Sequence, residues 1–334
     1  MAYASRQSSY LIASFGAILQ VLAGWDAFLD ASSGNLNSWW NPARLTLYAA
    51  IAITIIGVWR GVRYSPKQPP ISFSPIGFVN IVGLKLAGVG CLIEIVAGIW
   101  NEIVHRVFLN EPTISLTLFT VGMLTVNLGM VIGLVIEHGM IRHGLVIASA
   151  VRRRTVALFV SLSFCAIWLA ASGFFINIGR TFRSFPVNWL VAALLALVAT
   201  FVLVPVKKVM PRFGSGIGVG LAFNAVTYFV LKFYASSALY VPWGLLPITF
   251  FDLALYVLTP IIAFRRTIIV SSLIAGMFFW ATYYPFTTYL FSWSFAFGLP
   301  IFAVVIGSVA GALLGDKVYA SLSSVVLGDV GSSV

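Results

Sequence analysis

The sequence has few charged residues. Asp, Glu, Lys and Arg make up 9% of its 334 residues, whereas a water-soluble domain contains about a quarter. Hydrophobic residues make up 60%, and the mean hydropathy is +1.01. This composition indicates a polytopic membrane protein and leaves little chain for a soluble catalytic domain. Because about 20 apolar residues cross a bilayer, the chain is long enough for roughly ten spans.

Residues that commonly bind metals or haem are also scarce. The two cysteines, Cys91 and Cys165, fall inside apolar runs, where cysteine usually behaves as a small hydrophobe. The three histidines, His105, His138 and His143, lie near helix ends, whereas an intramembrane haem takes two facing axial ligands within the bilayer. We therefore predict no cofactor and no metal on this chain, and place any haem on a partner chain.

Signatures of soluble enzymes are absent as well. The chain contains no phosphate-binding loop and no nucleophile elbow. Its one glycine-rich run, GSGIGVG at 214–220, opens an apolar segment instead of following a strand. We interpret this run as a place where helices pack closely.

Apolar runs separated by turn and charge signals predict an all-α protein with about ten transmembrane helices. The boundary between the eighth and ninth rests only on Arg265 and Arg266, which we interpret as a tight turn. The predicted helices are 10–28, 45–59, 76–104, 114–136, 155–177, 186–206, 216–234, 243–264, 267–291 and 295–314.

The basic residues sort by side of the membrane. With the amino terminus inside, 14 of the 20 Lys and Arg residues fall on the cytoplasmic side, where basic residues normally stay. An even number of spans then places the carboxyl terminus in the cytoplasm too. We predict a multi-pass protein of the plasma membrane whose basic face touches anionic lipid and not nucleic acid.

The first two helical hairpins resemble each other. Trp25, Asp26 and Asp30 correspond to Trp100, Asn101 and His105 at an offset of 75, and each copy continues with a proline and a Leu-Thr-Leu-aromatic run. Both copies run out and back, so the pattern predicts a parallel duplication. We divide the chain into duplicated hairpins at 1–140 (repeat A 10–60, repeat B 76–138) and a six-helix membrane region at 141–334.

This hairpin motif resembles that of the C-type subunit of copper membrane monooxygenases, in which Asp-x3-His at a helix end and Pro-x-His at the next helix hold copper. In the first copy Asp26 matches the aspartate, Asp30 replaces the first histidine, and Arg44 falls near the last. In the second copy Asn101 replaces the aspartate, and His105 matches the first histidine. Neither copy keeps three ligands.

Two interpretations of the duplicated hairpins follow. An arginine beside two aspartates favours an ion-paired outer loop that docks a partner. Alternatively, Asp26, Asp30 and His105 form one composite metal site if the two hairpins pack side by side.

Three charged residues, Lys85, Glu94 and Asp252, fall within apolar runs and are expected to face the bundle interior or a partner. Lys85 and Glu94 are nine residues apart, on opposite faces of one helix, and cannot pair with each other. We predict an ion pair between Lys85 and Asp252. The alternative makes Glu94 or Asp252 a carboxylate on a proton path.

The segment 278–297 holds eleven aromatic residues and no charge. We interpret it as an aromatic belt at the membrane surface, with a quinone headgroup slot or a docking surface for an extracytoplasmic partner as alternatives.

By span number, size and scarcity of histidine, the whole chain resembles the hydrophobic membrane subunit of the archaeal two-haem b-type cytochrome. The resemblance implies a non-catalytic respiratory subunit that anchors or couples an electron-transfer complex, beside a haem-bearing subunit exposed outside. The alternative is a secondary transporter that uses Lys85, Glu94 and Asp252.

Overall fold

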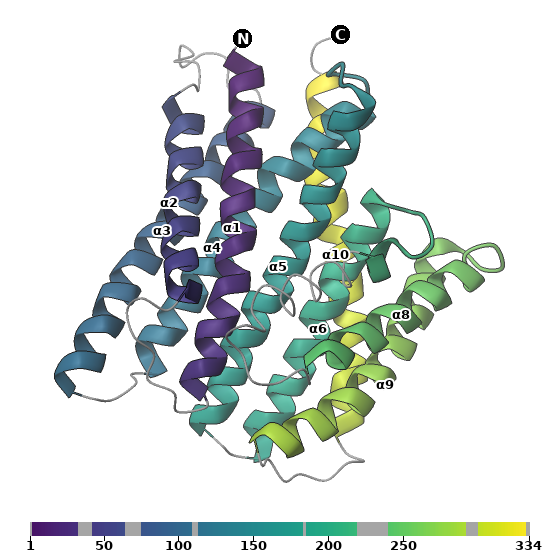
Figure 1. Cartoon of the computed structure of the whole chain (residues 1–334). Coiled ribbons are helices and arrows are strands. Elements are labelled where there is room, and N and C mark those ends of the chain that lie inside the picture. Colours follow the sequence, from purple (N-terminus) through teal and green to yellow (C-terminus); the bar gives the residue numbers. More distant parts are fainter. Residues whose placement is uncertain are drawn as a thin grey trace. The chain divides into compact units, whose positions relative to one another are not determined.

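A computed structural model describes residues 2–32, 42–63, 75–108, 113–182, 185–218, 240–291 and 300–331. Within these ranges the side chains near many helix ends are not described: 2–7, 25–32, 42–43, 75–80, 105–108, 113, 176–177, 179–182, 185–188, 240–246, 283, 285–291 and 326–331. Helices dominate the described ranges, which contain no strand (Figure 1).

The helices are long, and most begin or end where the sequence predicts. Three of them begin at a proline, where the missing N–H costs no hydrogen bond. Their bounds are α1 Ala2–Ser32, α2 Pro42–Arg63, α3 Pro75–Phe108, α4 Thr113–Arg142, α5 Ala150–Phe182, α6 Phe185–Val209, α8 Tyr240–Leu258, α9 Phe264–Phe291 and α10 Pro300–Gly331.

Seven described helices are long and apolar enough to cross a membrane. They belong to α2, α3, α4, α5, α6, α9 and α10, and each coincides with a predicted span. The described apolar parts of α1 and α8, Ser8–Gly24 and Pro247–Leu258, are shorter, and most of the predicted span at 216–234 lies outside the described residues. The prediction of an all-helical multi-pass membrane protein is confirmed; ten spans and cytoplasmic termini remain predictions.

The chain divides into two compact units. Unit 1 comprises Met1–Ala170 and Val318–Val334, and unit 2 comprises Ala171–Lys317. The division falls within α5 and α10, each of which contributes residues to both units, and not at the predicted boundary of 140.

In unit 1, α1 packs on α2 and α3 packs on α4 through matching glycines. A Cβ added at Gly16 of α1 would lie 2.8 Å from the carbonyl oxygen of Ala50. A Cβ added at Gly90 of α3 would lie 2.8 Å from the carbonyl oxygen of Gly122. These equivalent contacts are 74 residues apart on the first helices and 72 apart on the second.

A second pair of glycines, on the second helix of each hairpin, shows the same two offsets. A Cβ at Gly57 of α2 would lie 2.6 Å from the backbone nitrogen of Ala13, and one at Gly129 of α4 would lie 2.8 Å from that of Ala87. The two hairpins therefore pack in the same register, and backbone approach this close requires glycine.

The contacts between the two hairpins also repeat. A Cβ at Gly133 of α4 would meet the ring of Tyr10 on α1, and a Cβ at Gly61 of α2 would meet Leu84 on α3. Tyr10 of α1 corresponds to Leu84 of α3, 74 residues on, and Gly61 of α2 corresponds to Gly133 of α4, 72 residues on. Helices α1 to α4 thus form a four-helix bundle with approximate two-fold symmetry, in which Gln20 is equivalent to Glu94.

In unit 2, α10 lies against α6 through glycines at every fourth position. A Cβ at Gly307, Gly311 or Gly315 would lie between 2.0 and 2.3 Å from a backbone carbonyl oxygen of α6. The hydroxyl of Thr200 on α6 donates a hydrogen bond of 2.6 Å to the carbonyl of Ser308. Small residues with this spacing let membrane helices approach closely.

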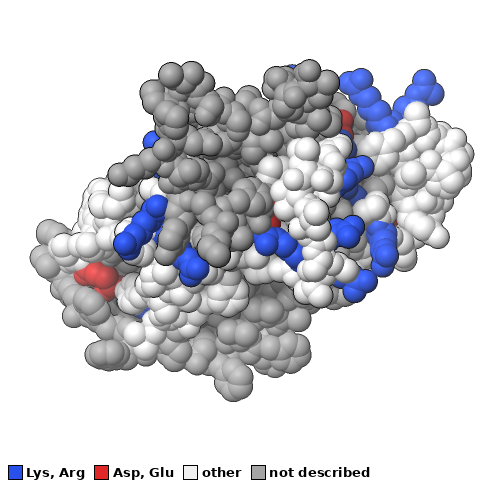
Figure 2. Space-filling view, turned by 90° about the horizontal axis from the view of Figure 1, so that it is seen from above, with Lys and Arg blue, Asp and Glu red and all other residues white. Residues whose placement is uncertain are grey.

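Exposed basic side chains gather at particular helix ends in each unit. Figure 2 shows many Lys and Arg side chains on the face that it views. In unit 1 they stand at the ends of α2 and α4 and at the start of α5. In unit 2 they follow α6 and begin α9, where Arg265 and Arg266 form the first turn after the α8–α9 connection. These are ends that the sequence assigns to the cytoplasm.

Candidate functional site

Glu94 differs from the other acidic side chains that the structure describes. The other four described carboxylates form ion pairs: Glu102 with Arg44, Glu137 with Arg152, Asp252 with Lys207, and Asp316 with Lys208. No cation among the described residues pairs with Glu94, although it is fully buried near the middle of the apolar span Ile81–Val104. Burying a charge without a partner is costly, so such a residue in a membrane helix usually serves a function.

Two neighbouring helices supply the polar partners of Glu94. When the amide of Gln20 on α1 is oriented with its nitrogen toward Glu94, that nitrogen lies 3.0 and 3.2 Å from the two carboxylate oxygens, and the amide oxygen accepts a hydrogen bond of 2.8 Å from Thr54 of α2. This orientation of the Gln20 amide satisfies both neighbours. Since Gln20 and Glu94 occupy equivalent positions in the two hairpins, the cluster lies beside the approximate two-fold axis.

Two further neighbours complete the surroundings of Glu94. The thiol of Cys91 lies one turn earlier on α3 and interacts with both Glu94 and Gln20. On α4, a Cβ added at Gly122 would lie 2.6 Å from Cγ of Glu94. Helix α4 therefore closes the cluster with backbone alone.

A cavity of about 490 Å³ extends from Glu94 between α2 and α3. Its walls are apolar and include the isoleucines 51, 55, 95, 99 and 103 as well as Phe119 of α4. Its size falls in the range of roughly 300–1,000 Å³ typical of small-molecule sites. Ile55 and Ile99 are 38% and 57% exposed, so the cavity opens on the side of the bundle that faces lipid in a membrane.

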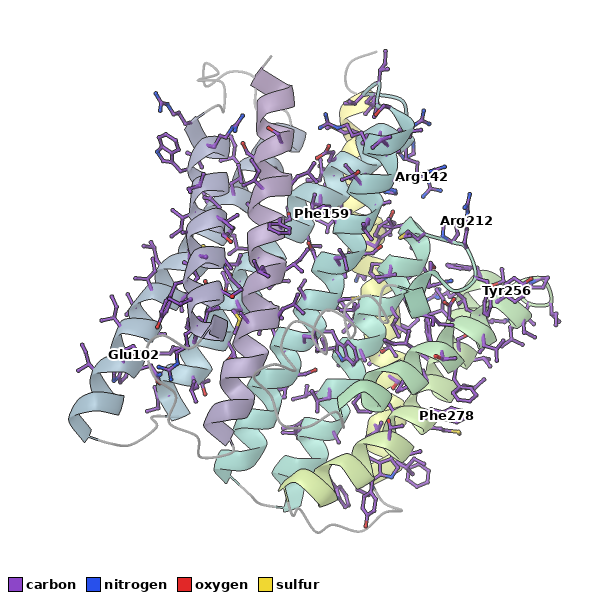
Figure 3. All side chains as sticks on the ribbon, viewed as in Figure 1. Glu102, Arg142, Phe159, Arg212, Tyr256 and Phe278 are labelled. Carbon is purple, nitrogen blue, oxygen red and sulfur yellow. The ribbon has the colours of Figure 1, made fainter. Side chains whose placement is uncertain are left out.

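A second polar cluster marks the other end of the cavity. Glu102, labelled in Figure 3, accepts a hydrogen bond of 2.9 Å from Arg44 and one of 3.3 Å from the hydroxyl of Tyr48. Glu102 follows Glu94 by eight residues, roughly 12 Å along the helix. The cavity is therefore an apolar passage with a carboxylate at each end: Glu102, which forms an ion pair with Arg44, and Glu94, which has no described cation beside it.

The duplicated motif is described only in part. Arg44, which the sequence places in an ion-paired outer loop, forms an ion pair with Glu102 of the second copy. Asn101 accepts a hydrogen bond of 2.7 Å from Ser115 of α4. The side chains of Asp26, Asp30 and His105, and with them the composite metal site, lie outside the described residues. Among the described residues, no three His, Cys, Asp or Glu side chains are placed to hold a metal ion.

The ion pair between Arg44, a predicted docking residue, and Glu102 can be tested by a measurement of stability. Its side chains are 15% and 16% exposed, so Arg44→Gln should lower stability by about 1 kcal/mol. Thermal unfolding in detergent measures the loss. The double variant with Glu102→Gln should regain part of it, and additive losses would contradict the pairing.

The prediction of an ion pair between Lys85 and Asp252 is wrong. Asp252 pairs with Lys207 of α6 inside unit 2, where both side chains are almost fully buried. The ammonium of Lys207 also donates to the carbonyl of Arg212 at 2.8 Å and to the hydroxyl of Ser215 at 3.1 Å. Lys85 is exposed on the surface of α3 and does not face the bundle interior.

The glycine run at 214–220 helps to hold Asp252. Gly214 has a φ of 80°, a backbone conformation that glycine adopts without strain. The turn it makes brings the backbone N–H of Ile217 within 3.4 Å of the second oxygen of Asp252. Because a cation and a backbone donor satisfy it, Asp252 is a structural residue and not a free carboxylate.

The described part of the aromatic segment 278–297 is not a surface belt. Phe279 and Trp280 are 1% and 0% exposed in the core of unit 2. Phe278 stacks on Phe250 of α8 with ring centroids 3.4 Å apart (Figure 3). The side chains beyond Tyr284 lie outside the described residues.

Comparison with known proteins adds no relative. No protein-family model, curated protein or solved structure matches this chain. The site must therefore be interpreted from its own residues.

Sequence reasoning identified Glu94 but missed Gln20, Thr54 and Lys207. A signal for Gln20 was present, because it is a polar residue in the apolar run AILQVLAG and lies 74 residues before Glu94. Aligning the copies on Leu22-Ala23-Gly24 with Val96-Ala97-Gly98, and not on the tryptophans, would have paired the two.

Proposed function

We propose that this chain is a proton-coupled secondary transporter of the membrane, with Glu94 as the group that binds the proton. The single observation that supports this function is the placement of Glu94. It is a buried carboxylate without a cation, beside the axis of two equivalent hairpins and at the end of an apolar cavity. Transporter sites often lie near the midplane at the interface between structural repeats.

The neighbours of Glu94 suit a group that changes its charge. The Gln20 amide donates to either carboxylate oxygen, and it can turn to accept from a protonated carboxyl because Thr54 both donates and accepts. Since neither neighbour carries a charge, only Glu94 changes its charge when a proton binds or leaves, and no neighbouring ion loses its counterion. Asp252, satisfied by Lys207, lacks this freedom.

Proton flux in reconstituted vesicles tests the proposed function. Solutes that raise the thermal stability of the purified protein are added to vesicles containing a pH-sensitive dye. The wild type should couple solute movement to a pH change, Glu94→Gln should abolish the change, and Glu94→Asp should retain part of it. Leu92→Ala, a change on the exposed face of the same helix and outside the cavity lining, is the matched control and should transport normally. Undiminished proton flux in Glu94→Gln would contradict the proposal.

The respiratory function expected from the sequence is a second candidate. In that case the chain anchors an electron-transfer complex in the plasma membrane, with the haem on an extracytoplasmic partner. The α2–α3 cavity favours it because a lipophilic quinone fits an apolar passage that has the hydroxyl of Tyr48 in its lining. Purification in mild detergent tests it, because a haem spectrum together with bound quinone would favour this candidate over a transporter.

A further inference from the structure

The α2–α3 cavity carries negative charge that no described residue neutralises. Its lining contains two acidic residues, Glu94 and Glu102, and no basic residue. Arg44 neutralises Glu102 from outside the lining, which leaves Glu94 without a cation. A ligand that enters the cavity and reaches Glu94 therefore gains most if it brings a positive charge.

The walls determine what kind of cation fits. Isoleucines cover most of the cavity, so a hydrated inorganic ion would lose its water without replacement oxygen ligands. Tyr48 and Phe119 add two aromatic rings, which attract cations through their faces. An anion would be repelled by Glu94, and a lipid acyl chain offers the carboxylate no partner.

We propose that this cavity binds a lipophilic organic cation, whose charged group pairs with Glu94 and whose apolar body lies between α2 and α3. The inference rests on the proposed function in one respect: it names the class of substrate for that transporter. The cation and the proton compete for the same carboxylate. Binding of one cation to protonated Glu94 therefore releases one proton.

The approximate symmetry of unit 1 is not exact at the cavity. On the equivalent side, Met123 and Asn127 stand where the cavity has Ile51 and Ile55. Met123 lies 2.9 Å from a Cβ position at Gly24, and Asn127 donates to the carbonyl oxygen of Met123 at 2.9 Å. Among the described residues, these two side chains thus occupy space between α1 and α4 at positions where isoleucines line the cavity between α2 and α3.

The groups that surround Glu94 indicate that the pH dependence of cation binding comes from Glu94 itself. Gln20 and Cys91 face it from α1 and from its own helix, Thr54 lies behind Gln20 on α2, and α4 approaches with Gly122 alone. The other described charged residue in the cavity lining, Glu102, is two turns away and already paired with Arg44. Cation binding should therefore strengthen with pH by up to about tenfold per unit where Glu94 titrates.

Equilibrium binding of tetraphenylphosphonium and of tetraphenylborate, two ions of similar shape and opposite charge, tests the inference. The purified full-length protein is titrated with each ion between pH 6 and 9. The wild type should bind one tetraphenylphosphonium, more tightly at high pH, and should not bind tetraphenylborate. Glu94→Gln should weaken the cation by about 30-fold or more, as for the loss of one partner of a buried ion pair.

A second variant tests the contribution of the cavity to binding separately from that of the carboxylate. Ala52 lines the cavity at an exposed position, so Ala52→Trp should fill it without disturbing the core, and should block the cation while Glu94 stays in place. Equal binding of both ions, no binding of either, or unchanged cation affinity in Glu94→Gln would overturn the inference.

The inference and the proposed function fail separately. If another solute drives proton flux that depends on Glu94 while tetraphenylphosphonium does not bind, the transporter stands and the lipophilic cation is wrong. If the cation binds through Glu94 and no solute moves protons, the site stands and transport is wrong.

Discussion

Replacing Asp252 by asparagine should destabilise unit 2 by about 3–5 kcal/mol, the usual cost of leaving one partner of a buried ion pair unpaired. Lys207 and Asp252 have side chains only 4% and 1% exposed, so water cannot take the place of the lost carboxylate. The ammonium would keep its hydrogen bonds to Arg212 and Ser215 but no counterion. The loss is measured by thermal or denaturant unfolding of the purified protein in detergent.

The adjacent pair supplies a matched control. Lys208 and Asp316 have side chains 20% and 31% exposed, so Asp316→Asn should cost about 1 kcal/mol or less. The double variant Lys207→Met with Asp252→Leu should recover most of the loss, because it removes both buried charges. If Asp252→Asn is no more destabilising than Asp316→Asn, the buried pair is not a structural element.

Replacing Gly129 by alanine should separate α3 from α4 and destabilise unit 1 by roughly 1–3 kcal/mol, the range for overpacking a tightly packed interface. A Cβ at this position would lie 2.4 Å from the carbonyl oxygen of Gly83 and 2.8 Å from the backbone nitrogen of Ala87. Backbone atoms cannot rotate away as a side chain can. The whole helix pair must move.

Gly98→Ala is the control for Gly129→Ala. The nearest atom to a Cβ at Gly98 is a ring carbon of Phe119 at 3.9 Å, an ordinary contact. Because alanine favours a helix over glycine by about 1 kcal/mol, this variant should be neutral or slightly more stable. Equal effects of the two variants on the unfolding temperature would show that the close contact does not limit stability.

Secondary structure was largely predictable because apolar runs of membrane length leave the backbone no alternative to a helix. The break between α8 and α9 is a local example: it was predicted at Arg265 and Arg266, whereas the connection lies at 259–263 and the two arginines stand in the first turn of α9. The burial of Glu94 was expected from its place in an apolar run, whereas the exposure of Lys85 was not, although a nine-residue separation does place the two on opposite helix faces.

The partners of the buried charges could not be predicted in the same way. Asp252 pairs with Lys207, which lies 45 residues away in the sequence, and no local pattern selects it over Lys85. Phe279 and Trp280 illustrate the same limit, because an aromatic run at a span end fits both a surface belt and a core. Composition alone does not distinguish the two.

The sequence by itself determined that the chain is a helical membrane protein, where most of its helices lie, and that Glu94 is an unusual residue. These conclusions depend on hydropathy and helical periodicity, which are local properties of the chain. The tertiary structure decided that Gln20 and Thr54 surround Glu94, that a cavity reaches it, and that Asp252 is neutralised. Those facts depend on the register in which glycine-lined helices pack, and register is set by contacts between residues far apart in the sequence.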